Sequence, residues 1–440
     1  METKLTRIAQ IAKQRPKEVF TSLYHLLNEN LLTQCHRELK GNKAAGIDHI
    51  TKEEYEQNLA GNIANLVNRL KNHSYKPQPV RRTYIPKGNG KEVRPLGIPS
   101  YEDKIVQMGL NKILQAIYET EFMKFSYGFR PNRSCHDALR ELNRIIHTGK
   151  INYIVDADIR KFFDTVDHEW VIKFLKLRIA DPNINRLITK FMKSGCMEEG
   201  QLIPTDVGTP QGSIVSPTLG NIYLHYVLDL WFVKVVKKRC KGQAEIVRYA
   251  DDSVFCFQYK EDAEWFYKEL IQRLEKFKLK VAEEKTKIII FGKYAEERCK
   301  AAGLNKPETF DFLGFTHYCG RSVNGKFRLM RKTSKKKFKA KVQEFKQWIK
   351  ASRNLKISEI FRATSSKLIG HYQYYGITDN MRMLSKFLYN IQKLLYKWLN
   401  RRSQRKSFSL DKFNLYLKIN PLPKPRIYAS MHYVGASSVK

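Results

Sequence analysis

Short apolar runs rich in β-branched residues alternate with amphipathic segments through the middle of the chain. The runs at residues 151–158, 244–257 and 285–292 have the composition of buried strands, and the second is two runs around a turn. Between them, residues 208–232 open on a Gly/Pro turn and continue as a long apolar helix, while residues 261–277 have the periodicity of an amphipathic helix. This order of strands and helices predicts an α+β domain with a mostly antiparallel sheet.

Carboxylates stand where two of these predicted strands end. The first strand ends at Asp158, and the segment after it continues into a helix for which Asp167 is the expected N-cap. Asp251 and Asp252 separate the two apolar runs of the second strand region, a pattern typical of a tight hairpin with both carboxylates at its tip. If these strands are neighbours in one sheet, three carboxylates lie close together.

Helical periodicity takes over in the last quarter of the chain, where apolar residues recur at spacings of three and four. Three successive segments show it: Phe338, Val342, Phe345 and Ile349; Ile357, Ile360, Phe361, Leu368 and Ile369; and Leu384, Leu388, Ile391, Leu395 and Trp398. Lysines occupy the other faces of the first segment. The pattern predicts a small bundle of three basic amphipathic helices.

Positive charge is concentrated in the same quarter. The 440 residues contain 80 Lys and Arg against 43 Asp and Glu, a net charge of +37, and residues 321–440 contain 29 of the basic residues but 4 of the acidic ones. Such a surplus repels itself unless an anion neutralises it, so we expect nucleic-acid contact rather than a merely solvated face. The run Lys335, Lys336 and Lys337 is the candidate for RNA binding.

Composition also argues against other classes of protein. No run of 18 apolar residues and no signal-peptide pattern is present, so we expect no membrane association and a cytoplasmic location. The seven cysteines form no CxxC pair, which argues against a zinc site and favours reduced thiols.

Three neighbouring carboxylates in a basic protein favour a site for divalent metal ions. Like charges a few ångströms apart raise one another's pKa, and hard cations such as Mg²⁺ relieve the repulsion while keeping coordination sites for phosphate and water. Two ions about 3.5 to 4 Å apart can activate a hydroxyl and stabilise a leaving pyrophosphate. An isolated Asp-Asp pair is usually an ordinary turn, but apolar strands on both sides and the earlier Asp158 favour the chemistry of nucleic-acid synthesis.

Motifs around these carboxylates resemble those of reverse transcriptases. Residues 249–252, Tyr-Ala-Asp-Asp, resemble the Y-x-D-D box; residues 158–164 resemble the D-x-x-x-[FY]-F box; and residues 210–213, Pro-Gln-Gly-Ser, resemble the PQG turn. More narrowly, the chain resembles the reverse transcriptase and maturase proteins encoded by bacterial group II introns. That narrower resemblance rests on residues 42–48, 85–87, 94–99, 127–131, 284–287, 312–315, 370–376 and 421–423.

The resemblance implies a metal site and its catalytic residues. Asp158, Asp251 and Asp252 would be catalytic, and together with the backbone carbonyl of Ile159 they would hold two Mg²⁺ ions, with Mn²⁺ as an alternative. Tyr249, Gly212 and Lys285 would contact primer or template, although a strand-edge lysine with no such role is nearly as good an interpretation of Lys285.

Nucleotide binding is implied for a second group of residues: Arg81, Lys87, Arg94, Phe163 and Gln211. Phe163 matches the aromatic position that packs under the sugar and excludes a 2′-hydroxyl, but the neighbouring Phe162 could be the packed ring instead. The segment between Lys87 and Arg94 is one residue longer than the commoner family spacing, so either Lys91 or Arg94 could contact the triphosphate.

Domains and partners follow from the same resemblance. Residues 1–60 would be an N-terminal extension, residues 61–320 the fingers and palm of a right-hand polymerase, and residues 321–440 a basic helical thumb or maturase domain. The partners would be group II intron RNA, an RNA template with a DNA or RNA primer, dNTPs and a DNA target, in the bacterial cytoplasm. Whether the chain forms a homodimer stays open.

We therefore predict an RNA-directed DNA polymerase that binds its group II intron RNA, promotes splicing and copies the RNA into cDNA during retrohoming. Two alternatives retain the same motifs: a domesticated relative in DNA repair or defence, and a splicing factor whose polymerase site is vestigial. Synthesis of RNA is disfavoured by Phe163. Because no paired cysteines follow the helical region and His432 is the only histidine after His371, we expect no endonuclease domain, as in the compact proteins of group IIC introns.

Overall fold

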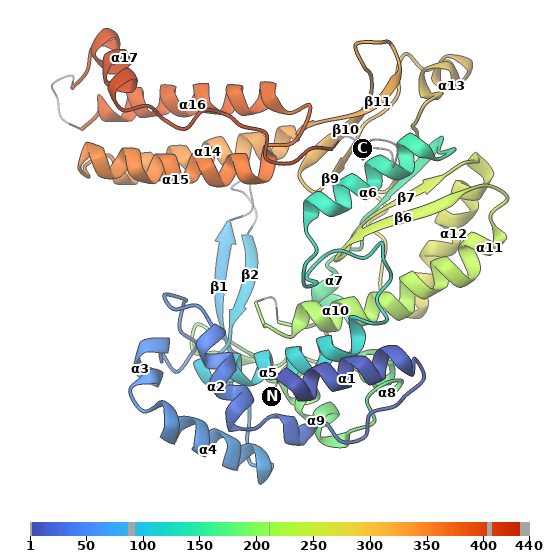
Figure 1. Ribbon diagram of the computed structural model, residues 1–440, viewed down its shortest axis with the longest axis vertical. Coiled ribbons are helices and arrows are strands. Elements are labelled where there is room, and N and C mark those ends of the chain that lie inside the picture. The colour runs from blue at the N-terminus through green and yellow to red at the C-terminus, as the bar shows by residue number, and fades with distance from the viewer. Residues whose placement is uncertain (1, 87–92, 211, 403–406, 432–440) are drawn as a thin grey trace. The chain divides into compact units, whose positions relative to one another are not determined.

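The computed structural model describes residues 2–86, 93–210, 212–402 and 407–431, which form an α+β protein (Figure 1). It contains two compact units. The first consists of the chain up to Ile85 with residues 93–138 and 155–288, and the second consists of residues 139–154 and the chain from Ile289 onward. The predicted fold class is confirmed, since the chain combines many helices with sheets in which antiparallel pairing predominates.

The first unit holds most of the elements. Its helices are α1 (Glu2–Gln14), α2 (Glu29–Glu38), α3 (Lys52–Glu56), α4 (Leu59–Lys71), α5 (Tyr101–Tyr118), α7 (Phe162–Thr165), α8 (His168–Lys176), α9 (Pro182–Met192), α10 (Ser216–Leu224), α11 (Lys237–Arg239) and α12 (Lys260–Lys276). Its strands are β1 (Val80–Pro86), β2 (Val93–Ile98), β4 (Cys196–Glu198), β5 (Gln201–Ile203), β6 (Ala244–Tyr249) and β7 (Asp252–Phe257). Four elements cross the division between the units: α6 (Cys135–Thr148), β3 (Tyr153–Ala157), β8 (Lys287–Ile290) and, at its last residue Pro86, β1.

The carboxylate-bearing sheet has the strand order β6-β7-β3-β8. Strands β6 and β7 form an antiparallel hairpin in which Ala244 faces Phe257 and Tyr249 faces Asp252, and Figure 1 shows the two strands side by side. Strand β3 lies next to β7, so the end of β3 and the tip of the hairpin belong to neighbouring strands. The predicted hairpin and the predicted adjacency are therefore both present. A second sheet, β2-β1-β4-β5, contains the parallel pair β1 and β4.

Local sequence determines where several helices begin. Asp167 accepts a hydrogen bond from the Trp170 backbone N–H at 3.0 Å and caps α8, as predicted. The predicted apolar helix begins at α10, but it continues through two π-helical turns, at His225–Asp229 and Phe232–Val236, before α11. A π-turn adds one residue to a helical turn without changing its composition, so apolar periodicity does not reveal it.

The second unit contains the predicted three-helix bundle. Its helices are α14 (Lys335–Ser352), α15 (Ile357–Tyr375) and α16 (Met381–Leu399), which Figure 1 shows packed along one another, together with α13 (Ala295–Ala301) and α17 (Leu410–Ile419). A three-stranded antiparallel sheet of β9 (Phe310–Phe312), β10 (Phe315–Arg321) and β11 (Phe327–Thr333) precedes the bundle. Helix α17 was not predicted; it spans ten residues, of which Phe413 is buried.

No helix within the described ranges is both long enough and apolar enough to span a bilayer.

Candidate active site

The tip of the β6–β7 hairpin is a two-residue turn formed by Ala250 and Asp251. The flanking residues Tyr249 and Asp252 pair with each other across the hairpin. Ala250 has a φ of 57°, in the left-handed region that a tight turn of this kind requires but that a residue with a Cβ adopts at a cost of about 1 to 2 kcal/mol. The surroundings of the turn must therefore compensate for this conformation.

Residues 127–131, one of the motif segments, provide a close backbone contact to that turn. A Cβ placed on Gly128 would lie 2.3 Å from the Ala250 backbone nitrogen, so only glycine allows the two backbones to approach so closely. The Gly128 carbonyl accepts a hydrogen bond from Asn221 Nδ2 at 2.7 Å, and the Tyr127 N–H donates to the Arg248 carbonyl at 2.9 Å. The motif thus supports the turn from one side.

Asp158 directly follows β3 and forms an ion pair with Lys285. Its Oδ2 lies 2.8 Å from Lys285 Nζ, with the carboxylate side chain 41% exposed and the lysine side chain 63% exposed. An ion pair this exposed contributes at most about 1 kcal/mol and can be exchanged for another cation. The lysine ammonium therefore neutralises part of the carboxylate charge at this edge of the sheet.

Asp251 is electrostatically coupled to its neighbours. Burial raises the pKa of its carboxyl above the usual value, the charge on Asp158 raises the pKa further, and Arg94 and Arg248 oppose both effects. Asp158 and Arg94 are therefore both close enough to interact with it. A carboxyl group whose pKa is raised in this way is one whose ionised form a divalent cation would stabilise.

The donor set fits a hard divalent cation. As the side chains stand in the described part of the chain, no three His, Cys, Asp or Glu residues converge as a completed ligand set. Ile159 lies opposite Val281 in an isolated antiparallel bridge. The two hydrogen bonds of this bridge are made by neighbouring residues: the Arg160 N–H donates to the Lys280 carbonyl, and the Ala282 N–H donates to the Asp158 carbonyl, each at 2.8 Å. This pairing leaves the Ile159 carbonyl unused, so it can accompany carboxylate oxygens around an ion.

The two neighbouring phenylalanines differ in exposure. Phe162 is buried at 2% exposure, whereas Phe163 is half-buried, and the two rings meet edge to face with centroids 5.1 Å apart. A Cβ on Gly220 would lie 3.1 Å from a ring carbon of each, so α10 packs closely against both. Phe162 is therefore the core ring, and Phe163 is the ring with surface to offer a substrate.

The loop before α10 is hydrogen bonded to the Phe163 segment. The Thr209 N–H donates to the Phe163 carbonyl at 2.7 Å. Gly212 has a φ of 111°, and a Cβ there would lie 2.5 Å from the Gly97 carbonyl oxygen, so both the conformation and the contact require glycine. The segment that leads into the PQG turn is thus directly hydrogen bonded to the segment that carries the two rings. Gln211, Lys87 and Lys91 lie outside the described residues.

The two described arginines among the nucleotide-binding candidates lie on paired strands. Arg81, on β1, donates from Nη2 at 2.7 Å and from Nε at 3.1 Å to the Ala45 carbonyl, which belongs to the motif at residues 42–48. Arg94, on β2, is exposed. The guanidinium of Arg81 thus already uses part of its hydrogen-bonding capacity within the protein, whereas the charge of Arg94 lowers the pKa of Asp251.

Two further groups of candidates differ in exposure. Tyr249 is half-buried at the end of β6. Lys335, Lys336 and Lys337 are all exposed and form the first turn of α14, which Ser334 caps by accepting from the Lys337 N–H at 3.4 Å.

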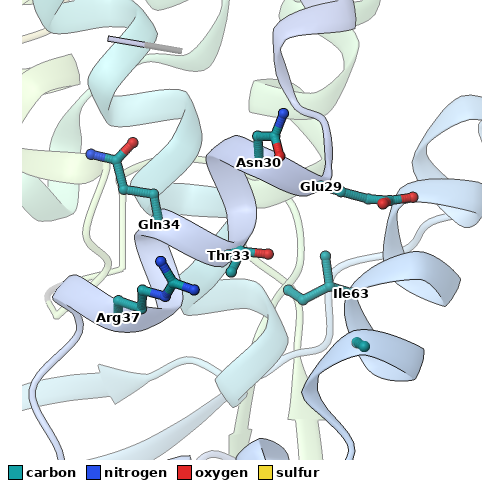
Figure 2. A pocket seen from close by; sticks show the side chains of 7 residues that line it. Glu29, Asn30, Thr33, Gln34, Arg37 and Ile63 are labelled. Atoms are coloured by element: carbon teal, nitrogen blue, oxygen red, sulfur yellow. The ribbon is translucent and has the colours of Figure 1, made fainter.

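A separate polar hollow of about 300 Å³ lies between α2 and α4 (Figure 2). Figure 2 shows the α2 side chains lining one wall with Ile63 of α4 opposite them; the lining residues are Glu29, Asn30, Thr33, Gln34, Arg37, Ala60 and Ile63. None of these is a residue to which the motifs assign a role in polymerisation.

Sequence reasoning missed polar residues buried beneath the turn. Arg248 and Asp229 are both completely buried, and Asn221 is 2% exposed. One signal for them is visible in the sequence, since an arginine inside the apolar run of β6 requires a buried partner. The identity of that partner depends on the tertiary fold.

Comparisons with known proteins match both parts of the chain. Residues 85–317 match the family described as reverse transcriptase (RNA-dependent DNA polymerase), and residues 335–415 match the group II intron maturase-specific domain. The group II intron-encoded protein LtrA of Lactococcus lactis subsp. cremoris is 32% identical over 454 residues, covering 88% of this chain and 75% of its own. Protein YkfC of Escherichia coli K12 is 38% identical over 189 residues, covering 42% of this chain and 49% of its own.

Replacement of Gly128 by alanine tests the contact between the motif segment and the turn. Because the new Cβ would overlap the Ala250 nitrogen, we expect Gly128→Ala to lower the free energy of unfolding by about 1 to 3 kcal/mol. Gly370, in α15, meets nothing within 4 Å of such a Cβ, so Gly370→Ala should instead raise stability by about 0.5 to 1 kcal/mol. Urea unfolding followed by circular dichroism measures both; unchanged stability of Gly128→Ala would contradict the close approach.

Proposed function

The chain belongs to the reverse transcriptases with a maturase domain that group II introns encode, and from this membership we propose how its residues share the work. It is an RNA-directed DNA polymerase and a splicing maturase with the right-hand polymerase fold.

Asp158, Asp251 and Asp252 are the catalytic carboxylates in this proposal, and with the Ile159 carbonyl they hold two Mg²⁺ ions. The observation that carries it is the geometry of the sheet, because Asp158 directly follows β3 while Asp251 and Asp252 stand at the tip of the hairpin whose strand β7 is the neighbour of β3. Such ions would activate the primer 3′-hydroxyl and neutralise charge on the leaving pyrophosphate, and Mn²⁺ could replace Mg²⁺.

Lys285 has a place in the same proposal because its ammonium pairs with Asp158. Before ions arrive, this contact lowers the repulsion between Asp158 and Asp251. When the ions bind the carboxylate, the long exposed side chain of Lys285 turns to a phosphate of the primer or template. Tyr249 and Gly212 complete the primer and template contacts in this proposal: Tyr249 ends the strand that leads into the catalytic turn, and Gly212 allows the loop before α10 to lie directly against the Gly97 backbone.

Selection of dNTPs is assigned to Phe163, because its half-buried ring presents the surface on which a sugar can rest. Arg94 contacts the triphosphate, a role that its charge near Asp251 supports; Lys91, the other cation of the longer segment, lies outside the described residues. Arg81 also binds the triphosphate after leaving the Ala45 carbonyl, and Lys87 and Gln211 keep the roles that the family motifs give them.

The first turn of α14 is an anion site for the RNA backbone in this proposal. Three exposed lysines occupy it, and it contains no acidic residue. Positive side chains at a helix N-terminus are unfavourable to the helix itself, since its macrodipole already places positive charge there. A phosphate at that end satisfies both the dipole and the lysines.

The partners include intron RNA, an RNA template with a DNA or RNA primer, dNTPs and a DNA target into which the copied intron is inserted. We also propose that residues 1–60, 61–320 and 321–440 act as the N-terminal extension, the fingers with the palm, and the thumb or maturase domain. The bacterial cytoplasm is the compartment in which these partners meet.

Removal of the Asp251 carboxylate tests the metal proposal. Asp251→Ala should abolish Mg²⁺-dependent primer extension while leaving affinity for RNA within a few fold, because the carboxylate does not contribute to the basic surface. Primer extension on an RNA template and filter binding of RNA measure the two properties, with the exposed Asp206→Ala as the control for loss of one negative charge in the same unit. Retention of more than a few per cent of synthesis by Asp251→Ala would overturn the assignment.

Shortening of the Phe163 side chain tests selection against ribonucleotides. Phe163→Val should raise the efficiency of rNTP relative to dNTP incorporation by roughly one to two decades, since steric exclusion of this kind is worth about 1 to 3 kcal/mol. Single-nucleotide extension kinetics give the ratio. Phe162→Val is the matched control and should destabilise the protein while leaving that ratio unchanged, because its ring is in the core. If only Phe162→Val changed this ratio, Phe162 and not Phe163 would be the ring that excludes ribonucleotides.

Neutralisation of the first turn of α14 tests RNA binding. Replacing Lys335, Lys336 and Lys337 by glutamine should weaken binding and reduce the log-log salt dependence by about 0.7 to 0.9 units for each RNA phosphate that the helix no longer neutralises. The control replaces Lys260, Lys268 and Lys276, three exposed lysines of α12, which changes the net charge equally. Equal effects of the two triple variants would mean that only overall charge matters.

A further inference from the structure

A fully buried ion pair lies beneath the catalytic turn. The Arg248 and Asp229 side chains are both 0% exposed, and they meet through two hydrogen bonds, from Nε to Oδ1 at 2.7 Å and from Nη2 to Oδ2 at 2.5 Å. This parallel two-bond geometry fixes the plane of the guanidinium relative to the carboxylate. The orientation of the arginine is therefore set by Asp229.

The same guanidinium holds the backbone of the turn. Its Nη1 donates to the Ala250 carbonyl at 2.8 Å and to Asn221 Oδ1 at 3.1 Å, so four of its five N–H groups have partners. Ala250 is the residue with left-handed backbone conformation, and Asp251 follows it directly. The bond to the Ala250 carbonyl therefore fixes the peptide group between Ala250 and Asp251.

Asn221 extends this network to the other side of the turn. Its Oδ1 accepts from Arg248, while its Nδ2 donates to the carbonyl of Gly128, whose Cα lies against the Ala250 nitrogen. One amide thus links the arginine that holds the Ala250 carbonyl to the glycine that packs against the Ala250 nitrogen. The peptide groups on both sides of Ala250 are restrained by a single connected set of contacts.

Asp229 is placed by an irregular piece of helix. It is the last residue of the first π-helical turn, His225–Asp229, and the carboxylate is buried against the sheet. A π-turn costs regular hydrogen bonding and occurs preferentially at functional sites. Here it brings a carboxylate from the long apolar helix to the arginine of β6.

Stability of the fold does not explain this pair. Desolvation of two ions cancels most of their attraction, and apolar side chains of similar size in such places often leave stability unchanged or higher. What an apolar pair cannot supply is the donor that holds the Ala250 carbonyl. The pair is therefore best explained by the conformation that it imposes on the turn.

We propose that Arg248 and Asp229 are positioning residues that fix the Ala250 peptide and thereby aim the Asp251 carboxylate at its metal-binding direction. The inference rests on the proposed role of Asp251. It adds that the carboxylate alone is insufficient, and that primer extension requires this buried pair although neither residue touches a substrate.

The decisive variant replaces both partners, Arg248→Met with Asp229→Leu, so that no unpaired charge is left in the core. We expect an unfolding temperature close to that of the wild type and unchanged affinity for RNA. Hydrogen exchange should become faster in the peptide that contains residues 249–252, and primer extension should fall by roughly 100-fold, the effect of about 1 Å of misplacement. The Mg²⁺ concentration for half-maximal rate should rise at the same time.

Two single variants serve as comparisons. Arg248→Lys keeps the charge but cannot hold both Asp229 and the Ala250 carbonyl, so it should show the same faster exchange and the same increased Mg²⁺ requirement. Val247→Ala removes a buried apolar group from the same strand, so it should lower the unfolding temperature without changing exchange in the turn or the Mg²⁺ requirement.

Two outcomes would overturn the inference. The first is that Arg248→Lys and the double variant both keep the wild-type rate of hydrogen exchange in residues 249–252 and the wild-type Mg²⁺ dependence. The second is that Val247→Ala changes both properties as much as these variants do. Either result, obtained while Asp251→Ala is inactive, rejects the positioning role and leaves the metal proposal intact. An active Asp251→Ala would instead reject the metal proposal itself.

Discussion

Repulsion between carboxylates at one edge of a sheet is the constraint around which the first unit is arranged. Burial raises the pKa of the Asp251 carboxyl, and the charge of Asp158 raises it further. Three basic side chains of the same unit compensate for this repulsion. Lys285 pairs with Asp158, Arg94 contributes its field at Asp251, and the buried Arg248 stabilises the turn from below. Divalent cations would complete that compensation when the substrates bind.

The second unit presents the opposite electrostatic problem. Positive charge dominates residues 321–440, and the exposed lysines at the start of α14 add to the positive end of the helix macrodipole. Apolar packing of α14 and α15 on α16 keeps the bundle together in spite of this repulsion. Under the proposed function, RNA phosphates would neutralise the positive charge of the maturase region, as metal ions would neutralise the negative charge of the carboxylates.

The sequence predicted features that depend on local pattern, and it failed where tertiary contacts decide. The hairpin, the position of Asp158 after β3 and the three-helix bundle follow from periodicity and turn chemistry. The buried partner of Arg248 and the π-turn that carries Asp229 leave no such pattern in the sequence. The choice between Phe162 and Phe163 illustrates this limit of local pattern, because two identical adjacent residues differ only in the burial that the fold gives them.

Crystals grown with primer, RNA template and an incoming dNTP, and soaked in Mn²⁺, give the most direct test of the central claim that the restrained turn completes a metal site. The account predicts two anomalous peaks, with both Asp158 and Asp251 as direct ligands, the Ala250 carbonyl still bonded to Arg248, and Lys285 released from Asp158. Anomalous peaks that contact neither carboxylate, or an ordered ternary complex in which Lys285 still occupies Asp158 and no ion is bound, would contradict it.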